Sequence, residues 1–277
     1  MKTTLYMLPE QSSSQMMSYV IQTKEGKLIV IDGGKRADAE YLYQKLTELS
    51  GPVPKVDAWF LTHPHPDHIE AILQLFHEKR PMEVCNIYSY FLEYDFYMEG
   101  HGPESYELDA GVLKEFEQFE REHADICKTL EAGQVITIGS VTVHILHVPK
   151  IPIEQGNKIN NSSVVFRMDT EGKRILFVGD LEPDGGEQVL TEVPAEELKT
   201  DYMQMAHHGQ GGVNRSFYEV TAPKVCMWHT PVWLWNNDIG GGYGTGPFRT
   251  LEVQKWMEEL GVQKNFVSKD GEHKIEF

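Results

Sequence analysis

The sequence predicts an α/β fold, and three observations predict it. The chain has 277 residues, of which 40% are hydrophobic and 24% are charged, as is typical of a globular protein with a sizeable core. Segments with the alternation of β-strands are followed by segments with the spacing of amphipathic helices. Side chains that bind metal ions follow several of the predicted strands, where ligands of α/β proteins gather. The length permits one large domain or two small ones, and we expect residues 1–277 to form a single domain.

The N-terminal part begins with a predicted β-hairpin. Residues 18–22 and 27–31 are strands, joined by a turn that contains Gly26. The second strand ends at Asp32, and the two glycines that follow permit a tight turn. Asp32 is therefore either an ordinary turn residue or a carboxylate that orients a metal ligand. A helix is predicted over residues 37–49.

The segment from Thr62 to Glu70 has the sequence Thr-His-Pro-His-Pro-Asp-His-Ile-Glu. An apolar strand is predicted before it, at residues 56–61, and a helix after it, to about residue 79. The two prolines stiffen the connecting turn. Imidazole and carboxylate groups suit zinc, iron and manganese, and four of them suit two adjacent ions better than one. A solvated, histidine-rich turn is the alternative. The four potential ligands are His63, His65, Asp67 and His68.

The middle of the chain contains further predicted elements but weaker candidate ligands. Residues 84–90 and 134–139 are predicted strands, 109–129 an acidic helix, and 141–148 a strand that bears His144 and His147 on opposite faces. We expect His147 to be structural, with metal ligation as the alternative. Surface positions are expected for His77, His101 and His123.

Two more candidate ligands follow predicted strands in the C-terminal half. After a Pro- and Lys-containing loop at 149–158, strands are predicted at 164–168, 174–178 and 201–206. The second of these leads into Asp180 and the third into His207-His208-Gly209, so both repeat the setting of the first cluster.

An aromatic segment lies near the C-terminus. Residues 228–235 contain three tryptophans, and a glycine-rich loop follows at 240–244. The tryptophans form either a wall of a substrate pocket or part of the core. His229 is not expected to bind metal. A closing helix at 248–260 and a strand at 264–267 are predicted.

Charge and cysteine content restrict the partners and the location. The formal net charge is −17, and no basic patch is evident, which disfavours long nucleic acid as a substrate. No apolar run approaches the roughly 20 residues needed to span a bilayer, and the first residues turn polar too soon for a secretory signal. Three widely spaced cysteines predict neither a disulfide framework nor a Cys-rich zinc site. A cytoplasmic protein that acts on a small molecule is expected.

Taken in order, Asp32, the cluster at residues 63–68, Asp180 and His207 resemble the successive motifs of the metallo-β-lactamase-fold hydrolases. Within that family the chain resembles the metallo-β-lactamase-like domain attached to the bacterial competence DNA-uptake channel. The features shared with that group are Asn161-Ser162-Ser163-Val164-Val165, Gly179-Asp180-Leu181-Glu182, His207-His208-Gly209, Tyr243-Gly244-Thr245-Gly246-Pro247 and Asp270-Gly271. The resemblance implies a four-layer αββα sandwich with the metal site at one edge of the two sheets.

One ligand of the wider family is absent. Most members have a Pro-Gly-His segment after the strand that corresponds to residues 141–148, whereas this chain has Pro149-Lys150-Ile151. The competence-type domains share this difference and carry asparagine nearby. The resemblance therefore implies that an amide oxygen of Asn160 or Asn161 completes the first site, with His147 as the other candidate. An oxygen ligand would favour a harder ion such as manganese.

The resemblance also implies roles for the remaining residues. His63 and His65 would hold one divalent ion, Asp67, His68 and His207 the second, and Asp180 would bridge them. The two ions, zinc or manganese with iron as a further possibility, would activate a water molecule. Asp67 would also orient the nucleophile, and His208 would either protonate the leaving group or be structural. A phosphoester is the favoured substrate, with a carboxylic ester, thioester or lactam as the first alternative and a non-catalytic metal-binding module as the second.

Overall fold

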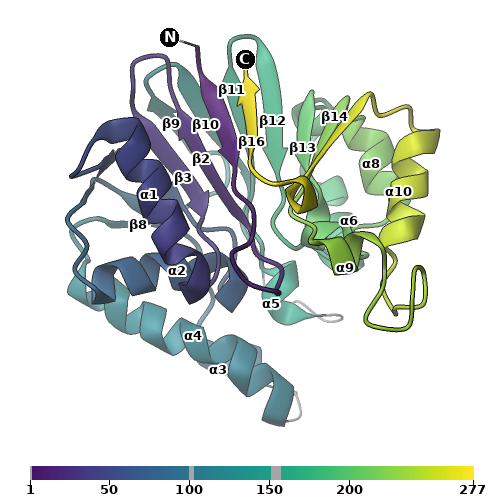
Figure 1. Ribbon diagram of the computed structural model, residues 1–277, viewed down its shortest axis with the longest axis horizontal. Coiled ribbons are helices and arrows are strands. Elements are labelled where there is room, and N and C mark those ends of the chain that lie inside the picture. Colours follow the sequence, from purple (N-terminus) through teal and green to yellow (C-terminus); the bar gives the residue numbers. More distant parts are fainter. Residues whose placement is uncertain (1, 100–102, 151–156) are drawn as a thin grey trace.

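Two seven-stranded sheets lie face to face in the computed structural model, which describes residues 2–99, 103–150 and 157–277. Helices cover the outer face of each sheet, so the four layers are α, β, β and α (Figure 1). The predicted αββα sandwich is confirmed. The strands β1 and β16, which carry the two ends of the chain, are neighbours in one sheet (Figure 1).

The first sheet is built largely from the N-terminal half and has the order β16-β1-β2-β3-β5-β7-β8. β2 and β3 form the predicted antiparallel hairpin, whereas β3, β5, β7 and β8 run parallel. The strands are β1 (Thr4–Met7), β2 (Ser18–Gln22), β3 (Leu28–Asp32), β5 (Ala58–Phe60), β7 (Ile87–Ser89), β8 (Cys127–Thr129) and β16 (His273–Glu276), beside a small pair of β4 (Lys55–Val56) and β6 (Glu83–Val84).

The outer face of this sheet is covered by α1 (Ala39–Ser50), α2 (Pro66–His77) and α4 (Pro103–Glu122) (Figure 1). The apolar stripe of α2 includes Ile69, Ile72 and Leu75, which are fully buried against the sheet. Because Pro66 stands at the first position of α2, the helix begins within the histidine-rich segment. The packing of α2 therefore fixes the metal-ligand candidates relative to the sheet.

The second sheet has the order β15-β14-β13-β12-β11-β10-β9. β9 to β12 are antiparallel, and β12 to β15 are parallel. Its strands are β9 (Val135–Ile138), β10 (Val141–His147), β11 (Val165–Thr170), β12 (Lys173–Phe177), β13 (Tyr202–Gln204), β14 (Val225–Trp228) and β15 (Lys264–Val267). The outer helices are α6 (Pro183–Glu192), α7 (Ala195–Leu198), α8 (Arg215–Thr221) and α10 (Thr250–Glu259).

An apolar layer joins the inner faces of the sheets. Phe60 of the first sheet lies 5.5 Å from Phe166 of the second, measured between ring centroids, and Phe166 stacks on Phe177. All three rings are buried, and burial of each contributes about 1.5–3 kcal/mol. The layer thus holds the two sheets, and with them the two halves of the candidate site, at a fixed separation. No helix of the described ranges is both long and apolar enough to cross a membrane.

The expected helix at 109–129 differs from the structure. α4 ends at Glu122, and Cys127–Thr129 form β8, which pairs in parallel with Ile87–Ser89. Pairing with a distant strand thus outweighs the local helical spacing. Strands β1 and β16 and the helices α3 (Tyr94–Met98), α5 (Lys158–Asn161), α6, α7, α8 and α9 (Val232–Trp235) were not expected from the sequence. His101 and residues 151–156 of the predicted loop lie outside the described residues.

Candidate metal centre

The candidate ligands gather where parallel strands of both sheets end. In the first sheet β3 ends at Asp32 and the neighbouring β5 leads into His63. In the second sheet β12 leads into Asp180 and the neighbouring β13 into His208. Because carboxyl ends of parallel strands meet at one edge, four distant segments contribute side chains to one place.

The first group of donors is His63, His65 and Asp180, all buried. His63 Nε2 lies 3.0 Å from His65 Nδ1 and 3.9 Å from Asp180 Oδ2. Ligand atoms about 2.0–2.1 Å from a tetrahedral zinc ion lie roughly 3.3–3.4 Å from one another. The spacing of this group therefore fits a single ion between the three side chains.

The second group is Asp67, His68 and His208. His208 Nε2 lies 3.3 Å from Asp67 Oδ2 and 3.3 Å from Asp180 Oδ2, and His68 Nε2 lies 3.4 Å from the same Asp180 oxygen. These separations again match the edges of a zinc coordination shell. Asp180 Oδ2 thus lies near members of both groups, as a bridging carboxylate would.

Several atoms of the two groups are buried without a hydrogen-bond partner. They include His68 Nε2, His208 Nε2 and Asp180 Oδ1. Each unsatisfied buried polar atom costs about 1–3 kcal/mol. A cation would satisfy the lone pairs of all three, so these residues fit a metal site.

The charges of the protein groups alone are strongly coupled. Burial acts to lower the pKa of His68, but the carboxylates of Asp180 and Asp32 outweigh it and raise that pKa well above its usual value. Burial likewise opposes ionisation of Asp67, but its hydrogen bond with His208 and the charge of His68 hold its pKa well below the usual range. Burial and the neighbouring His68 keep the pKa of His63 well below its usual value. Burial also opposes ionisation of Asp180, but the charges of His208 and His68 hold its pKa well below its usual value. Asp67 and Asp180 therefore stay ionised and attract positive charge.

Asp32 and Thr62 orient the ligands from outside the two groups. Asp32 Oδ2 lies 2.8 Å from His68 Nδ1 and accepts a 2.8 Å hydrogen bond from the Thr62 hydroxyl, while Asp32 Oδ1 accepts one from the Thr62 N–H. Because Asp32 holds a proton on Nδ1, Nε2 of His68 faces Asp180 and is the nitrogen left to bind a metal ion in place of its own proton. Of the two interpretations of Asp32 open from the sequence, the orienting role agrees with this geometry, although Asp32 also has the positive φ of a turn residue.

The adjacent His207 and His208 occupy different positions from those inferred by resemblance. Both have positive φ, 49° and 52°, so their side chains diverge from the strand direction. His208 is buried and belongs to the second donor group, with Nδ1 bound to the His229 carbonyl at 3.0 Å. His207 Nε2 lies 4.0 Å from Asp180 Oδ2, and its side chain is 21% exposed. The geometry favours His208 as the ligand, whereas the resemblance assigned this role to His207.

Three residues are candidates for the additional ligand of the first site, and the structure gives them different surroundings. Asn161 Oδ1 accepts hydrogen bonds from the N–H groups of Glu182 and Gly185 at the start of α6. His147 Nδ1 lies 3.2 Å from Glu192, away from both donor groups. Asn160 Oδ1, in contrast, is buried without a partner, and the residue lines the cavity beside the donors. Asn161 and His147 each contact α6, and of the three candidates only Asn160 lines this cavity.

A cavity of about 280 Å³ opens onto the two donor groups. Its lining is almost entirely polar and consists of Ser14, Gln15, Lys35, His65, Pro66, Asp67, Asn157, Asn160, Asp180, Glu182 and His207. The tryptophans of 228–235 do not line it: Trp228 is buried in the outer core, and Trp233 packs at a tilt against Phe248 and donates a hydrogen bond to the Ser13 carbonyl. The segment 228–235 was interpreted either as a wall of a substrate pocket or as part of the core, and the structure shows its tryptophans in packing contacts.

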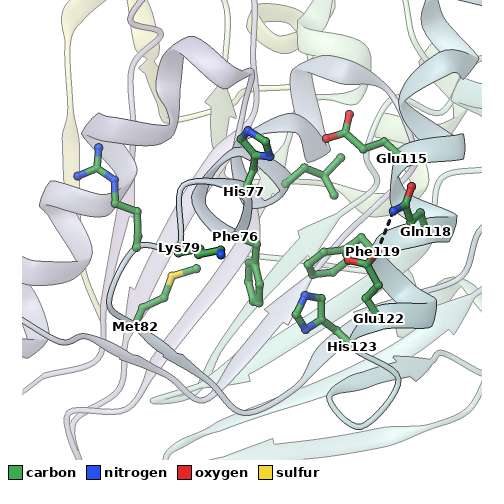
Figure 2. Close-up of a pocket in the computed structure, with 11 residues that line it drawn as sticks. Phe76, His77, Lys79, Met82, Glu115, Gln118, Phe119, Glu122 and His123 are labelled. Carbon is green, nitrogen blue, oxygen red and sulfur yellow. Dashed lines mark hydrogen bonds between the residues drawn. The ribbon is translucent and has the colours of Figure 1, made fainter.

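A larger cavity, of about 730 Å³, lies between the C-terminal end of α2 and α4 (Figure 2). Phe76, Phe119 and His123 pack together in it, and charged side chains surround them (Figure 2). None of its lining residues belongs to either donor group. His77 and His123 are thus remote from the candidate metal centre.

Comparison with known proteins decides the family. The model of the metallo-β-lactamase superfamily matches residues 14–155. The chain belongs to this superfamily. The expected likeness to the competence-type domain is confirmed by ComE operon protein 3 of Bacillus subtilis, which is 30% identical over 177 residues. That match covers 63% of this chain but only 20% of the relative, so the chain spans a small part of that protein's length.

Solved structures of other proteins share the architecture. YhfI from Bacillus subtilis has a TM-score of 0.56 at 14% identity, with 99% of each chain covered. A diphosphatase from the PhnP family has a TM-score of 0.52 at 15% identity and covers 100% of this chain and 98% of its own. At these identities the similarity shows the common fold.

Several residues at the site were not singled out from the sequence. Thr62 could have been suggested by its position between the strand and the first histidine. Lys35 directly follows the Asp32-Gly33-Gly34 turn, whereas Ser14 and Gln15 come from a connecting segment far from the motifs and reach the cavity only through the fold.

Proposed function

We propose that the chain is a metal-dependent hydrolase in which two divalent cations are held by the two donor groups. One ion would be held by His63 and His65, the other by Asp67, His68 and His208, and Asp180 would contact both. The observation that carries the proposal is the placement of Asp180 Oδ2 within 3.3–3.9 Å of nitrogen atoms from both groups. We further propose Asn160, with its unpaired buried amide oxygen, as the additional ligand of the first site.

The chemistry of the donors restricts the ions. Imidazole nitrogen and carboxylate oxygen suit zinc, manganese and iron, and an amide oxygen moves the first site towards manganese. Ions held in such pairs lower the pKa of water and polarise a phosphoryl or acyl oxygen. Asp67, ionised and directed into the cavity, would orient the nucleophilic water, as inferred from the sequence.

The ligand role of His208 replaces its inferred role as a proton donor. Its Nδ1 is bound to the His229 carbonyl and its Nε2 lies between two carboxylates, so neither nitrogen reaches the open cavity. His207 lines the cavity and lies 3.7 Å from Glu182 through Nδ1, so it is the histidine placed to contact a substrate.

We propose a phosphoester as the substrate class. The lining of the cavity is polar and contains no aromatic side chain other than histidine, which is unsuited to an apolar acyl group. The resemblance to a diphosphatase agrees with this choice. We also propose that residues 1–277 form one domain, because the apolar layer between the sheets includes residues from Leu5 to Ile275. Three free cysteines support a reducing, cytoplasmic location.

The test is hydrolysis of bis-p-nitrophenyl phosphate and p-nitrophenyl phosphate by protein loaded with zinc or manganese. We expect turnover by the wild type and its loss in Asp180→Asn. Asp184→Asn is the matched control, because Asp184 lies four positions after Asp180 but is exposed. The Asp184→Asn variant should be as active as the wild type. Turnover of p-nitrophenyl acetate or nitrocefin alone would favour the acyl-hydrolase alternative. Bound metal without any turnover would favour the non-catalytic module.

A further inference from the structure

Among the described residues, one lysine lines the cavity over the two donor groups. Lys35 shares this cavity with Asp67, Asp180 and Glu182. Its ammonium nevertheless forms no ion pair with any of the described acidic residues, although the chain carries 42 of them against 25 lysines and arginines. The charge of Asp38 acts on Lys35 from beyond ion-pair distance. A cation that lines the cavity and is not held in an ion pair is available to a ligand.

The backbone of Lys35 is fixed relative to the metal-ligand helix. The N–H of the preceding Gly34 donates to the His68 carbonyl at 3.3 Å, and the Gly34 carbonyl accepts from the Ala71 N–H at 2.9 Å. Gly34 has a φ of 92°, and a Cβ atom there would lie 2.9 Å from Asp38 Oδ2. The segment before Lys35 therefore lies directly on the first turn of α2, which also carries Asp67.

Asp38 connects Lys35 to Ser14 and Gln15, and these three residues are called the rim of the cavity. Its Oδ2 accepts the Lys35 N–H at 2.8 Å, and its Oδ1 accepts the Gln11 N–H at 2.7 Å. Asp38 is itself only 1% exposed, so the connection is shielded from solvent. It joins Lys35 to the loop between β1 and β2, whose Ser14 and Gln15 also line the cavity.

The rim is well suited to a tetrahedral oxyanion. Lys35 supplies an ammonium, Ser14 a hydroxyl and Gln15 an amide, all of which donate hydrogen bonds. A phosphoryl group carries several negatively charged acceptor oxygens, whereas a neutral carboxylic ester carries none. Charge-assisted hydrogen bonds are stronger and shorter than neutral ones, so the cation discriminates between the two classes.

We propose that Lys35 binds the non-bridging oxygens of a phosphate group in the substrate and so selects phosphoesters over neutral acyl substrates. This inference rests on the proposed hydrolase function. Lys35 takes no part in holding the metal ions. It acts in recognition, and because the ammonium attracts the phosphate before and during reaction, its loss raises KM more than it lowers kcat.

The experiment measures binding of inorganic phosphate to metal-loaded protein by isothermal titration calorimetry. We expect Lys35→Met to weaken phosphate binding by roughly 10-fold or more, and Lys35→Arg to retain most of the affinity. Lys173→Met, which removes an exposed lysine at the opposite end of β12 from Asp180, is the matched control and should bind phosphate as the wild type does. Metal content and melting temperature should be the same in all four proteins.

Kinetics provide the second readout. In Lys35→Met, KM for p-nitrophenyl phosphate should rise by a similar factor, with KM for p-nitrophenyl acetate unchanged. Equal phosphate affinity in the wild type and Lys35→Met, or no phosphate binding by metal-loaded wild type, would overturn the inference. Failure of the proposed function has a different signature, since the wild type would then fail to bind metal or fail to hydrolyse any phosphoester.

Discussion

Replacement of Asp32 by asparagine tests how the fold prepares His68 to bind a metal ion. The Asp32 carboxylate is fully buried and lies 2.8 Å from His68 Nδ1. An asparagine has nearly the same shape, but its amide nitrogen cannot accept the Nδ1 proton. If the amide donates to Nδ1 instead, the proton of neutral His68 moves to Nε2 and blocks the lone pair that faces Asp180.

The structure sets the size of the expected effect. The lost contact between His68 and Asp32 is a charge-assisted hydrogen bond, worth about 1.5–3 kcal/mol. Because 1.4 kcal/mol corresponds to a tenfold change, the affinity for the ion bound by His68 should fall by about 10- to 100-fold. The other ion should be affected less, since His63 and His65 make no hydrogen bond with Asp32 in the described structure.

The assay is a zinc titration of metal-free protein in competition with a chromogenic chelator. Asp57→Asn is the matched control: Asp57 also accepts a backbone N–H, from Leu28, and pairs with Lys27, but it has no contact with the donor groups. We expect one weakened site in Asp32→Asn and two unchanged sites in Asp57→Asn. Two sites of wild-type affinity in Asp32→Asn would refute the orienting role of Asp32.

Three further predictions follow from the site and its surroundings. His208→Ala should lose the ion of the second donor group, whereas His207→Ala should keep both ions, as measured by metal content. The reverse pattern would restore His207 as the ligand, which is the assignment made by resemblance. Removal of metal with a chelator should lower the melting temperature by about 5–15 °C, because each ion at 100 times its Kd stabilises the fold by about 2.7 kcal/mol. An unchanged melting temperature would argue against metal bound in the native state. Burial lowers the pKa of His229 to about 3, so the unfolded chain binds more protons than the folded one between that pKa and about 6.5. The His229 contribution to stability should therefore fall by about 1.6 kcal/mol from pH 6.5 to pH 5. His229→Gln should remove this part of the pH dependence of denaturant unfolding, and an equal slope in both proteins would contradict it.

The sequence was most informative where ligands adjoin strong local patterns. The strands before Asp32, His63 and Asp180 are apolar and the residues after them include glycine or proline, so both the elements and the placement of side chains at their ends could be predicted. The αββα architecture came from resemblance and is confirmed by the two sheets and their outer helices.

The sequence was least informative where neighbouring residues of the same type compete. His207 and His208 differ in position because two successive positive φ angles rotate them apart, and no local pattern predicts such angles for histidine. Asn160 and Asn161 are likewise separated by the contact that Asn161 makes with the start of α6. Pairing of β8 with β7 depends on residues about 40 positions apart and therefore leaves no periodic signal.

The most direct test of the account is the number of metal ions bound per chain. Inductively coupled plasma mass spectrometry of protein saturated with zinc or manganese and then freed of excess metal should give two ions per wild-type chain. Asp180→Asn should bind fewer, because Asp180 lies between both donor groups. Less than one ion per wild-type chain, or two ions retained in a variant that lacks both Asp180 and His208, would contradict the central claim.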